Sequence, residues 1–232
     1  MIKVSMLSSH NAMPREGHLE AVYYLFAYQK KHENSTMVFD DARPCVDEWR
    51  FKDVNWKDFY GDVEEAIPPN MPEPRGNSVK MTTFVDADHA GNLATRRSQT
   101  GILIYLNKSP IVWFSKRQNT VESSTFGSEF IALRVATEMI EALRYKLRMF
   151  GIPIDGPTDI MCDNQSVVTS SSMPESTLSK KHNSICYHRV REACAQDTIR
   201  VAKEDTGTNL ADLFTKPLPT PQRKFLLSKI LY

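Results

Sequence analysis

Three β-rich runs in succession, followed by one long amphipathic stretch, limit the folds open to this chain. The runs lie between residues 81 and 118 and read MTTFVDAD, TGILIYLN and PIVWFSKRQ. Asn107-Lys108-Ser109 joins the last two runs as a hairpin connection. A helical pattern then extends from about Ser124 to Phe150 and stops at Gly151. Consecutive strands ahead of a long helix indicate a sheet with helices on its faces.

Strand-like and helix-like segments alternate in the rest of the chain. In order they read TDIMCD (strand), NQSVVTSSS (helix), SICYHRVREACAQDT (helix) and TIRVAKED (strand). A final helical region begins at Asn209. Together with the first three runs, this order predicts an α/β fold with a mixed five-stranded sheet flanked by helices.

A proline-rich stretch, AIPPNMPEPRGNS at residues 66 to 78, separates a short N-terminal piece from the rest. The N-terminal piece holds one helical pattern, HLEAVYYLFAYQKK, entered near Pro14, and one strand-like run, STMVFDD. So few elements cannot bury much surface alone. We therefore expect a small N-terminal α/β appendage that packs on something else.

Composition narrows the functional classes only slightly. The chain is 41% apolar and 25% charged, as in ordinary globular proteins, so disorder throughout is not expected. Its net charge is +1, so any attraction to phosphates must come from local clusters, although solvated surface charge explains each cluster alone. The clusters are Arg96-Arg97, Lys116-Arg117, Lys180-Lys181-His182, Arg189 with Arg191, and Arg223-Lys224.

The cysteines and the hydropathy profile favour an intracellular protein. The four cysteines show neither paired spacing nor zinc-ligand spacing with the histidines. The first residues lack the apolar core of a signal peptide, and no segment approaches the roughly 20 apolar residues of a membrane span. We expect reduced thiols and no membrane association.

Four acidic residues fall where oxygen ligands could gather around divalent cations at one edge of the sheet: Asp86, Glu129, Asp163 and Asp212. A carboxylate such as Asp86 is costly on a buried strand face unless it is paired or bound to metal, but costs nothing at a strand end facing water. Glu129 lies four residues before Leu133 on the apolar stripe of the long helix, so it faces the core. A glutamate in the first turn also suits the helix dipole.

The other two acids have structural alternatives of equal weight. Asp163 ends a strand and precedes a helix, which makes it a natural N-cap, although ligand-binding acids also favour the carboxyl ends of strands. Asp212 follows Asn209 by three residues, the capping-box position. The interpretation as cation ligands therefore depends on the four acids taken together.

Two histidines and one aromatic pair also allow more than one role. His182 lies in a polar basic segment from which it could reach a phosphate, whereas His188 on a helix is typical of structural hydrogen bonding. Trp113 and Phe114 are expected in the core rather than as platforms for stacked bases.

The motifs in order resemble the ribonuclease H domain of copia-type LTR retrotransposon polyproteins, over residues 81 to about 219. They read DADHAG, RRSQTG, IVWFSKRQ, SEFIAL, CDNQS, KKH, HRVRE and LADLFTKPLP. The earlier VSMLSSHNAMPREGHLEAVYYLFAY resembles the thumb and connecting region of the reverse transcriptase in the same polyprotein. The expected domains are a reverse transcriptase remnant (1–65), a Pro-rich linker (66–80), a ribonuclease H domain (81–219) and a C-terminal helical tail (220–232).

The resemblance implies roles for individual residues. Two Mg²⁺ ions, or Mn²⁺ as a substitute, would be held by Asp86, Glu129, Asp163 and Asp212. Asp86 would bridge both ions, and Asp163 would hold the ion beside the attacking water. His182, in the family's K-H pair, would assist catalysis or product release. Contacts to nucleic acid would come from Arg97, Ser98, Asn164, Gln165 and Lys181.

Four positions depart from the family pattern. His89 replaces the usual tryptophan after DAD, and Gly127 stands where an acid is common just before Glu129. Lys180 and Asn183 replace the threonine before the K-H pair and the isoleucine after it. None of these changes removes an expected metal ligand. The chain also contains no Tyr-x-Asp-Asp-like motif, so we expect no polymerase active site.

The resemblance implies an endoribonuclease that cuts the RNA strand of RNA–DNA hybrids by two-metal hydrolysis during retrotransposon reverse transcription. Its partners would be the hybrid and the reverse transcriptase portion of the parent polyprotein. Its location would be cytoplasmic, in a virus-like particle, or nuclear. Two alternatives stay open, a catalytically inactive nucleic-acid-binding remnant and a nuclease of the same fold that acts on DNA.

Overall fold

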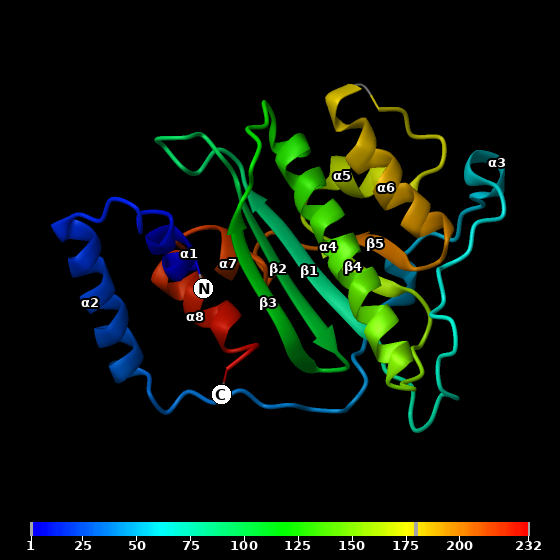
Figure 1. Ribbon diagram of the computed structural model, residues 1–232, viewed down its shortest axis with the longest axis horizontal. Helices are drawn as coiled ribbons and strands as arrows, with labels where there is room; N and C mark the ends of the chain where they lie inside the picture. The colour runs from blue at the N-terminus through cyan, green and yellow to red at the C-terminus, as the bar shows by residue number, and fades with distance from the viewer. Residues whose placement is uncertain (1, 179–180, 232) are drawn as a thin grey trace.

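The computed structural model describes residues 2–178 and 181–231, and one mixed sheet organises them (Figure 1). Its strand order is β3-β2-β1-β4-β5. β1 and β3 both pair antiparallel with β2, whereas β4 and β5 continue the sheet parallel to β1. The strands span Met81–Asp88 (β1), Gln99–Leu106 (β2), Ser109–Arg117 (β3), Thr158–Cys162 (β4) and Ile199–Lys203 (β5). The predicted mixed five-stranded sheet is confirmed.

Helices cover both faces of the sheet (Figure 1). The helices α4 to α6 lie on one face, and α1, α7 and α8 lie on the other, with α2 further out. The α-helices span Ile2–Ser8 (α1), Glu16–Lys31 (α2), Lys57–Tyr60 (α3), Thr125–Met149 (α4), Gln165–Ser172 (α5), Ser184–Ala195 (α6), Asp212–Thr215 (α7) and Thr220–Leu227 (α8). The 3₁₀ turns are Glu48–Arg50 (η1) and Lys181–Asn183 (η2).

The alternating side chains of β1 and β2 serve two separate hydrophobic clusters. Val85 and Ile102 join the larger cluster, which lies between the sheet and α4 to α6. Leu103 and Tyr105 join the smaller cluster with residues of α7 and α8, and Phe84 packs against it. A strand buried on both faces is expected for the centre of a sheet with helices on each side.

Helix α4 follows the sequence pattern closely. The Ser124 hydroxyl accepts a hydrogen bond from Gly127 N at 3.2 Å and caps the helix. The predicted apolar stripe is buried at Leu133, Ala136, Ile140 and Leu147. The helix ends before Gly151, whose φ of +69° lies in the region that favours glycine.

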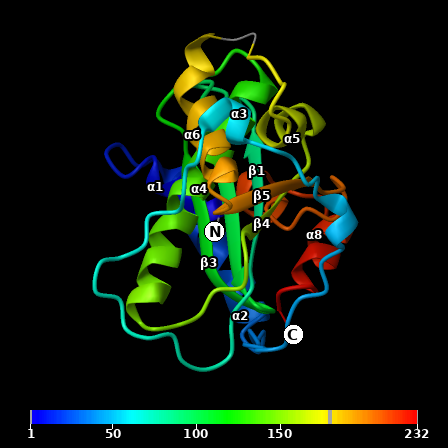
Figure 2. The same cartoon turned by 90° about the vertical axis from the view of Figure 1, so that its right-hand side faces the viewer.

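Residues 41–65, here called the strap, form the second part of the N-terminal piece and run along the edge of the sheet. Figure 2 shows the strap, in blue to cyan, passing β5 and reaching α3 beside α6. Arg50 forms an ion pair with Glu204 at 2.9 Å and donates to Lys203 O at 3.0 Å. The strap therefore covers β5, the edge strand of the sheet, whose backbone would otherwise be open to pairing with another chain.

The end of the strap is held by a buried ion pair. Glu65 accepts hydrogen bonds from Arg144 at 2.7 and 2.8 Å and from Arg148 at 2.6 Å. The Arg144 side chain is only 4% exposed, so it depends on this carboxylate. Burial works to raise the pKa of Glu65, but the hydrogen bonds from Arg144 and Arg148 outweigh it and lower the pKa to about 2.

Two local predictions differ from the structure. STMVFDD forms no named strand: Met37 makes an isolated antiparallel bridge with Leu231, and Ser109 Oγ and Asn107 Nδ2 donate to the backbone oxygens of Asp40 and Asp41. The helical region expected from Asn209 consists of the two short helices α7 and α8. Trp113 is 42% exposed instead of buried in the core. Within the described ranges, no helix has the length and apolar character needed to cross a membrane.

Candidate functional site

The site is built around Asp86 near the end of β1. Asp86 is only 2% exposed and lies opposite Gly101 in the β1–β2 register. A Cβ atom on Gly101 would lie 2.6 Å from Thr215 Cγ2 and 2.8 Å from Ala211 O. Glycine at this position therefore allows α7 to pack directly on the sheet. This close approach lets the Thr215 hydroxyl donate a hydrogen bond to Asp86 Oδ2.

The structure brings the four predicted carboxylates together. Ligand atoms of Asp86, Asp163 and Asp212 lie within 4.8 Å of one another. A second group of atoms within 4.8 Å comprises Glu129, Cys162 and Asp163, so Asp163 belongs to both groups. The residues come from β1, from α4, from the end of β4 and from the start of α7. The role of Asp86 as the bridge between two ions stays a prediction.

The N-cap of α5 explains why the Asp163 carboxylate is free to join the cluster. The capping residue is Asn164, whose Oδ1 accepts hydrogen bonds from Ser166 N at 3.0 Å and Val167 N at 3.3 Å. The alternative in which Asp163 is the cap is therefore wrong. Lys203, the last residue of β5, donates from its Nζ to the backbone oxygen of Asp163, and this hydrogen bond joins the segment after β4 to β5.

Crowding and burial disfavour the charged forms of these acids. Burial, with the charges of Asp86 and Asp163, raises the pKa of Glu129 to about 8. Burial also raises the pKa of Asp212 to about 7, with Asp86 adding to the rise and a hydrogen bond from Lys216 opposing it. The pKa of Asp163 is raised by burial and then by Asp86. The cluster thus holds more negative charge than its surroundings neutralise.

Lys216 is a site residue that the sequence interpretation missed. Its Nζ lies 2.7 Å from Asp212 Oδ1 and 3.6 Å from Asp86 Oδ2. Burial would lower the pKa of Lys216, but Asp86, Asp212 and Asp163 together raise it. The available signal was its place four residues after Asp212, where side chains on one helical turn meet.

The donor set fits a hard divalent cation. Asp212 is fully buried, and within the described part of the chain its Oδ2 has no hydrogen-bond partner. A buried carboxylate oxygen without a donor is costly unless a positive charge compensates it. Several carboxylate oxygens at one point are the ligands preferred by Mg²⁺ and related cations. The four acids would be the residues that hold such ions.

The predicted nucleic-acid contacts differ in accessibility. Ser98 is 1% exposed, and its hydroxyl accepts a hydrogen bond from Ala90 N at 3.1 Å, so it shapes the loop after β1. Gln165 is exposed and donates to Thr169 at 3.2 Å. Lys181 is exposed and Arg97 is half-buried. Lys180, a departure from the family pattern, lies outside the described residues.

The two histidines have different partners. His182 lies in η2, and its Nε2 is 3.2 Å from Glu122 Oε2, a residue outside the carboxylate cluster. His188 Nδ1 shares a hydrogen bond of 2.9 Å with the Tyr60 hydroxyl of the strap, which supports its structural role. The His188 side chain is nevertheless exposed and not packed in the core.

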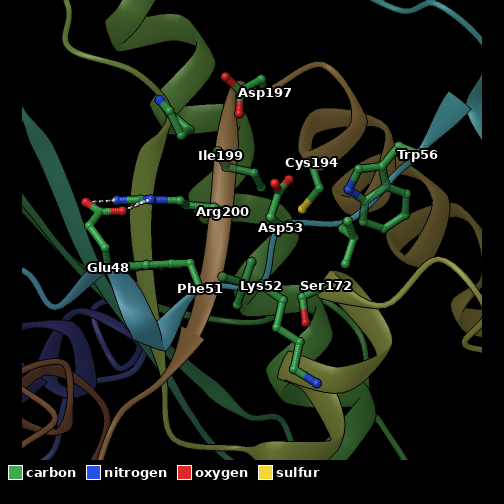
Figure 3. A pocket seen from close by; sticks show the side chains of 13 residues that line it. Glu48, Phe51, Lys52, Asp53, Trp56, Ser172, Cys194, Asp197, Ile199 and Arg200 are labelled. Atoms are coloured by element: carbon green, nitrogen blue, oxygen red, sulfur yellow. Dashed lines mark hydrogen bonds and ion pairs between the residues drawn. The ribbon is translucent and has the colours of Figure 1, made fainter.

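A cavity at the far edge of the sheet is a weaker functional candidate. It has a volume of about 400 Å³ and lies between the strap and β5 (Figure 3). Its lining includes Phe51, Trp56, Cys194 and the ion pair between Glu48 and Arg200. None of the four clustered carboxylates lines it. Lys52, Asp53 and Asp197 also line it, but among the described residues no three potential metal ligands converge there as they do in the carboxylate cluster.

Pol polyproteins of plant retrotransposons are similar to this chain. The retrovirus-related Pol polyprotein from transposon RE1 of Arabidopsis thaliana is 31% identical over 156 residues, or 67% of this chain and 11% of that protein. The corresponding polyprotein from transposon TNT 1-94 of Nicotiana tabacum is 34% identical over 157 residues, or 67% of this chain and 12% of that protein. The chain spans about one tenth of the length of these relatives. No family model matches the chain.

Solved structures of ribonuclease H domains are similar to the structure of this chain. LC11-RNase H1 in complex with an RNA/DNA hybrid has 15% sequence identity and a TM-score of 0.48, covering 59% of this chain and 94% of its own. The N-terminal RNase H domain of rv2228c from Mycobacterium tuberculosis, solved as a fusion with maltose binding protein, has 12% identity and a TM-score of 0.46. That match covers 65% of this chain and 98% of the other.

Proposed function

Because this chain belongs to the copia-type family of retrotransposon Pol polyproteins, we propose that its carboxylate cluster is the active site of a ribonuclease H. The reaction is hydrolysis of the RNA strand of an RNA–DNA hybrid during reverse transcription. The observation that carries the proposal is the meeting of Asp86, Asp163 and Asp212 within 4.8 Å, with one buried oxygen of Asp212 lacking a donor.

Three residues around the carboxylates position them and balance part of their charge. Thr215 holds Asp86 in place, and Gly101 keeps α7 close enough for Asp212 to join it. Lys216 neutralises part of the cluster. Two divalent cations, Mg²⁺ or Mn²⁺, would activate the attacking water and stabilise the leaving 3′ oxygen. No nucleophilic side chain is required, because water attacks the phosphorus directly.

Substrate choice rests on the basic and polar residues around the cluster. Lys181 is exposed and Arg97 is half-buried, and both can contact phosphates of the hybrid. Discrimination of RNA from DNA would use the 2′-hydroxyl, and hybrid preference would follow backbone shape. The partner in the full polyprotein would be its reverse transcriptase portion, in a cytoplasmic virus-like particle or in the nucleus.

Cleavage of a labelled RNA–DNA hybrid by the purified chain tests the proposal. We expect cleavage in Mg²⁺ that EDTA abolishes and that Asp86→Asn and Asp163→Asn each remove while the chain stays folded. Glu129→Gln should also lose activity, and Glu138→Gln, at an exposed position on the same helix, is its matched control and should retain activity.

The same assay separates the alternatives. Binding of the hybrid without cleavage in either Mg²⁺ or Mn²⁺ would identify an inactive nucleic-acid-binding remnant. Preferential cleavage of duplex DNA would identify a DNA nuclease of this fold. Full activity in both aspartate variants would refute the assignment of the carboxylate cluster.

A further inference from the structure

Two stretches far apart in the sequence are basic and contain no acidic residue. Residues 21–31 read AVYYLFAYQKK and hold two lysines, and residues 213–231 hold three lysines and one arginine. The whole chain has 29 basic and 28 acidic residues, so it is almost neutral. The two stretches are therefore local accumulations of positive charge.

The helices α2 and α8 bring these two stretches together around one groove. The groove has a volume of about 930 Å³ and is here called the basic groove. Its lining includes Tyr28 and Lys30 of α2, and Arg223, Lys224 and Leu227 of α8. None of the four clustered carboxylates lines it, so it is a separate feature of the molecule.

The cations of the basic groove are not neutralised by neighbouring acids. Glu33 is the one acidic residue in its lining. Within the part of the chain that the structure describes, neither Lys30 nor Arg223 nor Lys224 forms an ion pair. In the cavity beside the strap, by contrast, Arg200 is paired with Glu48. Unbalanced positive charge in a concave surface attracts an anionic partner.

An aromatic ring lies among these cations. Tyr28 is 40% exposed, and the guanidinium carbon of Arg223 lies 5.8 Å from the centroid of its ring. A single-stranded nucleic acid offers phosphates to cations and unpaired bases to rings, whereas the bases of a duplex are already stacked on one another. An acidic protein segment would use the charges and leave the ring without a stacking partner. The combination of ring and cations therefore favours a single strand.

We propose that the basic groove binds single-stranded nucleic acid, with Arg223 and Lys224 contacting phosphates and Tyr28 stacking against a base. Helix α8 contacts α7, the helix that begins at Asp212, so the groove and the carboxylate cluster belong to neighbouring elements. Binding in the groove does not depend on the proposed function, because the groove contains none of the four acids.

Binding of fluorescein-labelled oligouridylate and oligothymidylate to the full chain, measured by anisotropy in EDTA, tests the charged contacts without cleavage. Arg223→Gln combined with Lys224→Gln should weaken binding about 25-fold at about 0.1 M salt, because each lost phosphate contact lowers the slope of log K against log salt by about 0.7. The matched control is Arg75→Gln combined with Lys146→Gln. It removes the same two charges from exposed positions near the end of α4 and should bind as wild type does.

Tyr28→Ala tests the stacking contact separately from the charges. It should weaken binding about tenfold and leave the salt dependence as in wild type, because stacking on a base releases no counterions. Unchanged binding in Tyr28→Ala would overturn the proposal, and so would equal losses in the two double variants. Displacement of the oligonucleotide by polyglutamate at equal charge would identify an acidic protein partner and would also overturn it. Thermal unfolding of each variant checks that the chain is folded.

The same variants keep this proposal distinguishable from the proposed function. If wild type binds single strands through the groove but cleaves no hybrid, the proposed function fails and the groove assignment stands. If wild type cleaves the hybrid while the Arg223→Gln, Lys224→Gln variant binds single strands as tightly as wild type, the groove assignment alone fails.

Discussion

Replacing Glu129 by glutamine should stabilise the metal-free chain at neutral pH, although the same change removes an expected metal ligand. The pKa of Glu129 is raised from its ordinary 4.5 to about 8 by burial and then by the charges of Asp86 and Asp163. Folding therefore favours the protonated form. The free-energy cost of burying the Glu129 carboxyl group is absent below pH 4.5, where it is protonated in both states, and grows as the pH rises toward 8.

The magnitude follows from the two pKa values. Each tenfold difference in proton affinity corresponds to about 1.4 kcal/mol. Between the unfolded-state pKa and pH 7, the penalty reaches about 3 kcal/mol, which is an upper limit because the site can relax. Glutamine has the same shape and no titrating proton, so it should recover up to this amount at pH 7 and less than about 1 kcal/mol at pH 5.

Urea unfolding in EDTA at pH 5 and pH 7 measures this difference for wild type, Glu129→Gln and the exposed control Glu138→Gln. Adding Mg²⁺ should stabilise wild type more than Glu129→Gln, because a cation that binds only the folded state adds to stability. A Glu129→Gln variant that is less stable than wild type at pH 7 in EDTA would refute the reasoning, as would a gain that does not change with pH.

Three further changes test other parts of the molecule. Glu65→Gln should cost about 2 to 3 kcal/mol in urea at pH 7 by leaving Arg144 unpaired. Because the pKa of Glu65 is lowered to about 2, this loss of unfolding free energy should shrink as the pH falls from 4.5 toward 2. A cost of only a few tenths of a kcal/mol at pH 7 would show that the strap contributes little. Lys216→Met removes a positive charge that competes with the cation, so the Mg²⁺ concentration at the midpoint of thermal stabilisation should fall about fivefold. That factor corresponds to the ~1 kcal/mol repulsion between two unit charges 4 Å apart in water. A higher midpoint would show that Lys216 assists binding. Gly101→Ala should lower stability by about 1 to 3 kcal/mol and reduce cleavage, since its Cβ would meet Ala211 O, and unchanged melting would contradict the packing argument.

Local patterns were sufficient for the fold class and for much of α4. The period of apolar residues at Leu133, Ala136 and Ile140 identified the buried face of the helix, and Gly151 marked its end. The same period placed Glu129 toward the core. Such predictions succeed because helix and strand periodicity is a property of neighbouring residues, and it states directly which face must leave water.

The same patterns failed where backbone groups found partners far along the chain. STMVFDD has the composition of a strand, but it makes one isolated bridge, between Met37 and Leu231, and the side chains of Asn107 and Ser109 donate to its last two carbonyls. Trp113 has the character of a core residue and is 42% exposed. Local propensity does not specify which remote element arrives to satisfy a backbone group or to cover a ring.

The sequence alone determined the mixed α/β fold, the long helix and the set of four acids, because spacing and side-chain type encode faces and chemistry. Only the tertiary structure decided which other residues complete the site. Lys216 reaches Asp86 because Gly101 allows α7 onto the sheet, and Glu122 reaches His182 because Gly127 leaves room. Both contacts join residues 60 or more positions apart in the sequence. The physical reason is that steric room and charge balance at one point depend on several elements at once, and no single stretch of sequence contains them.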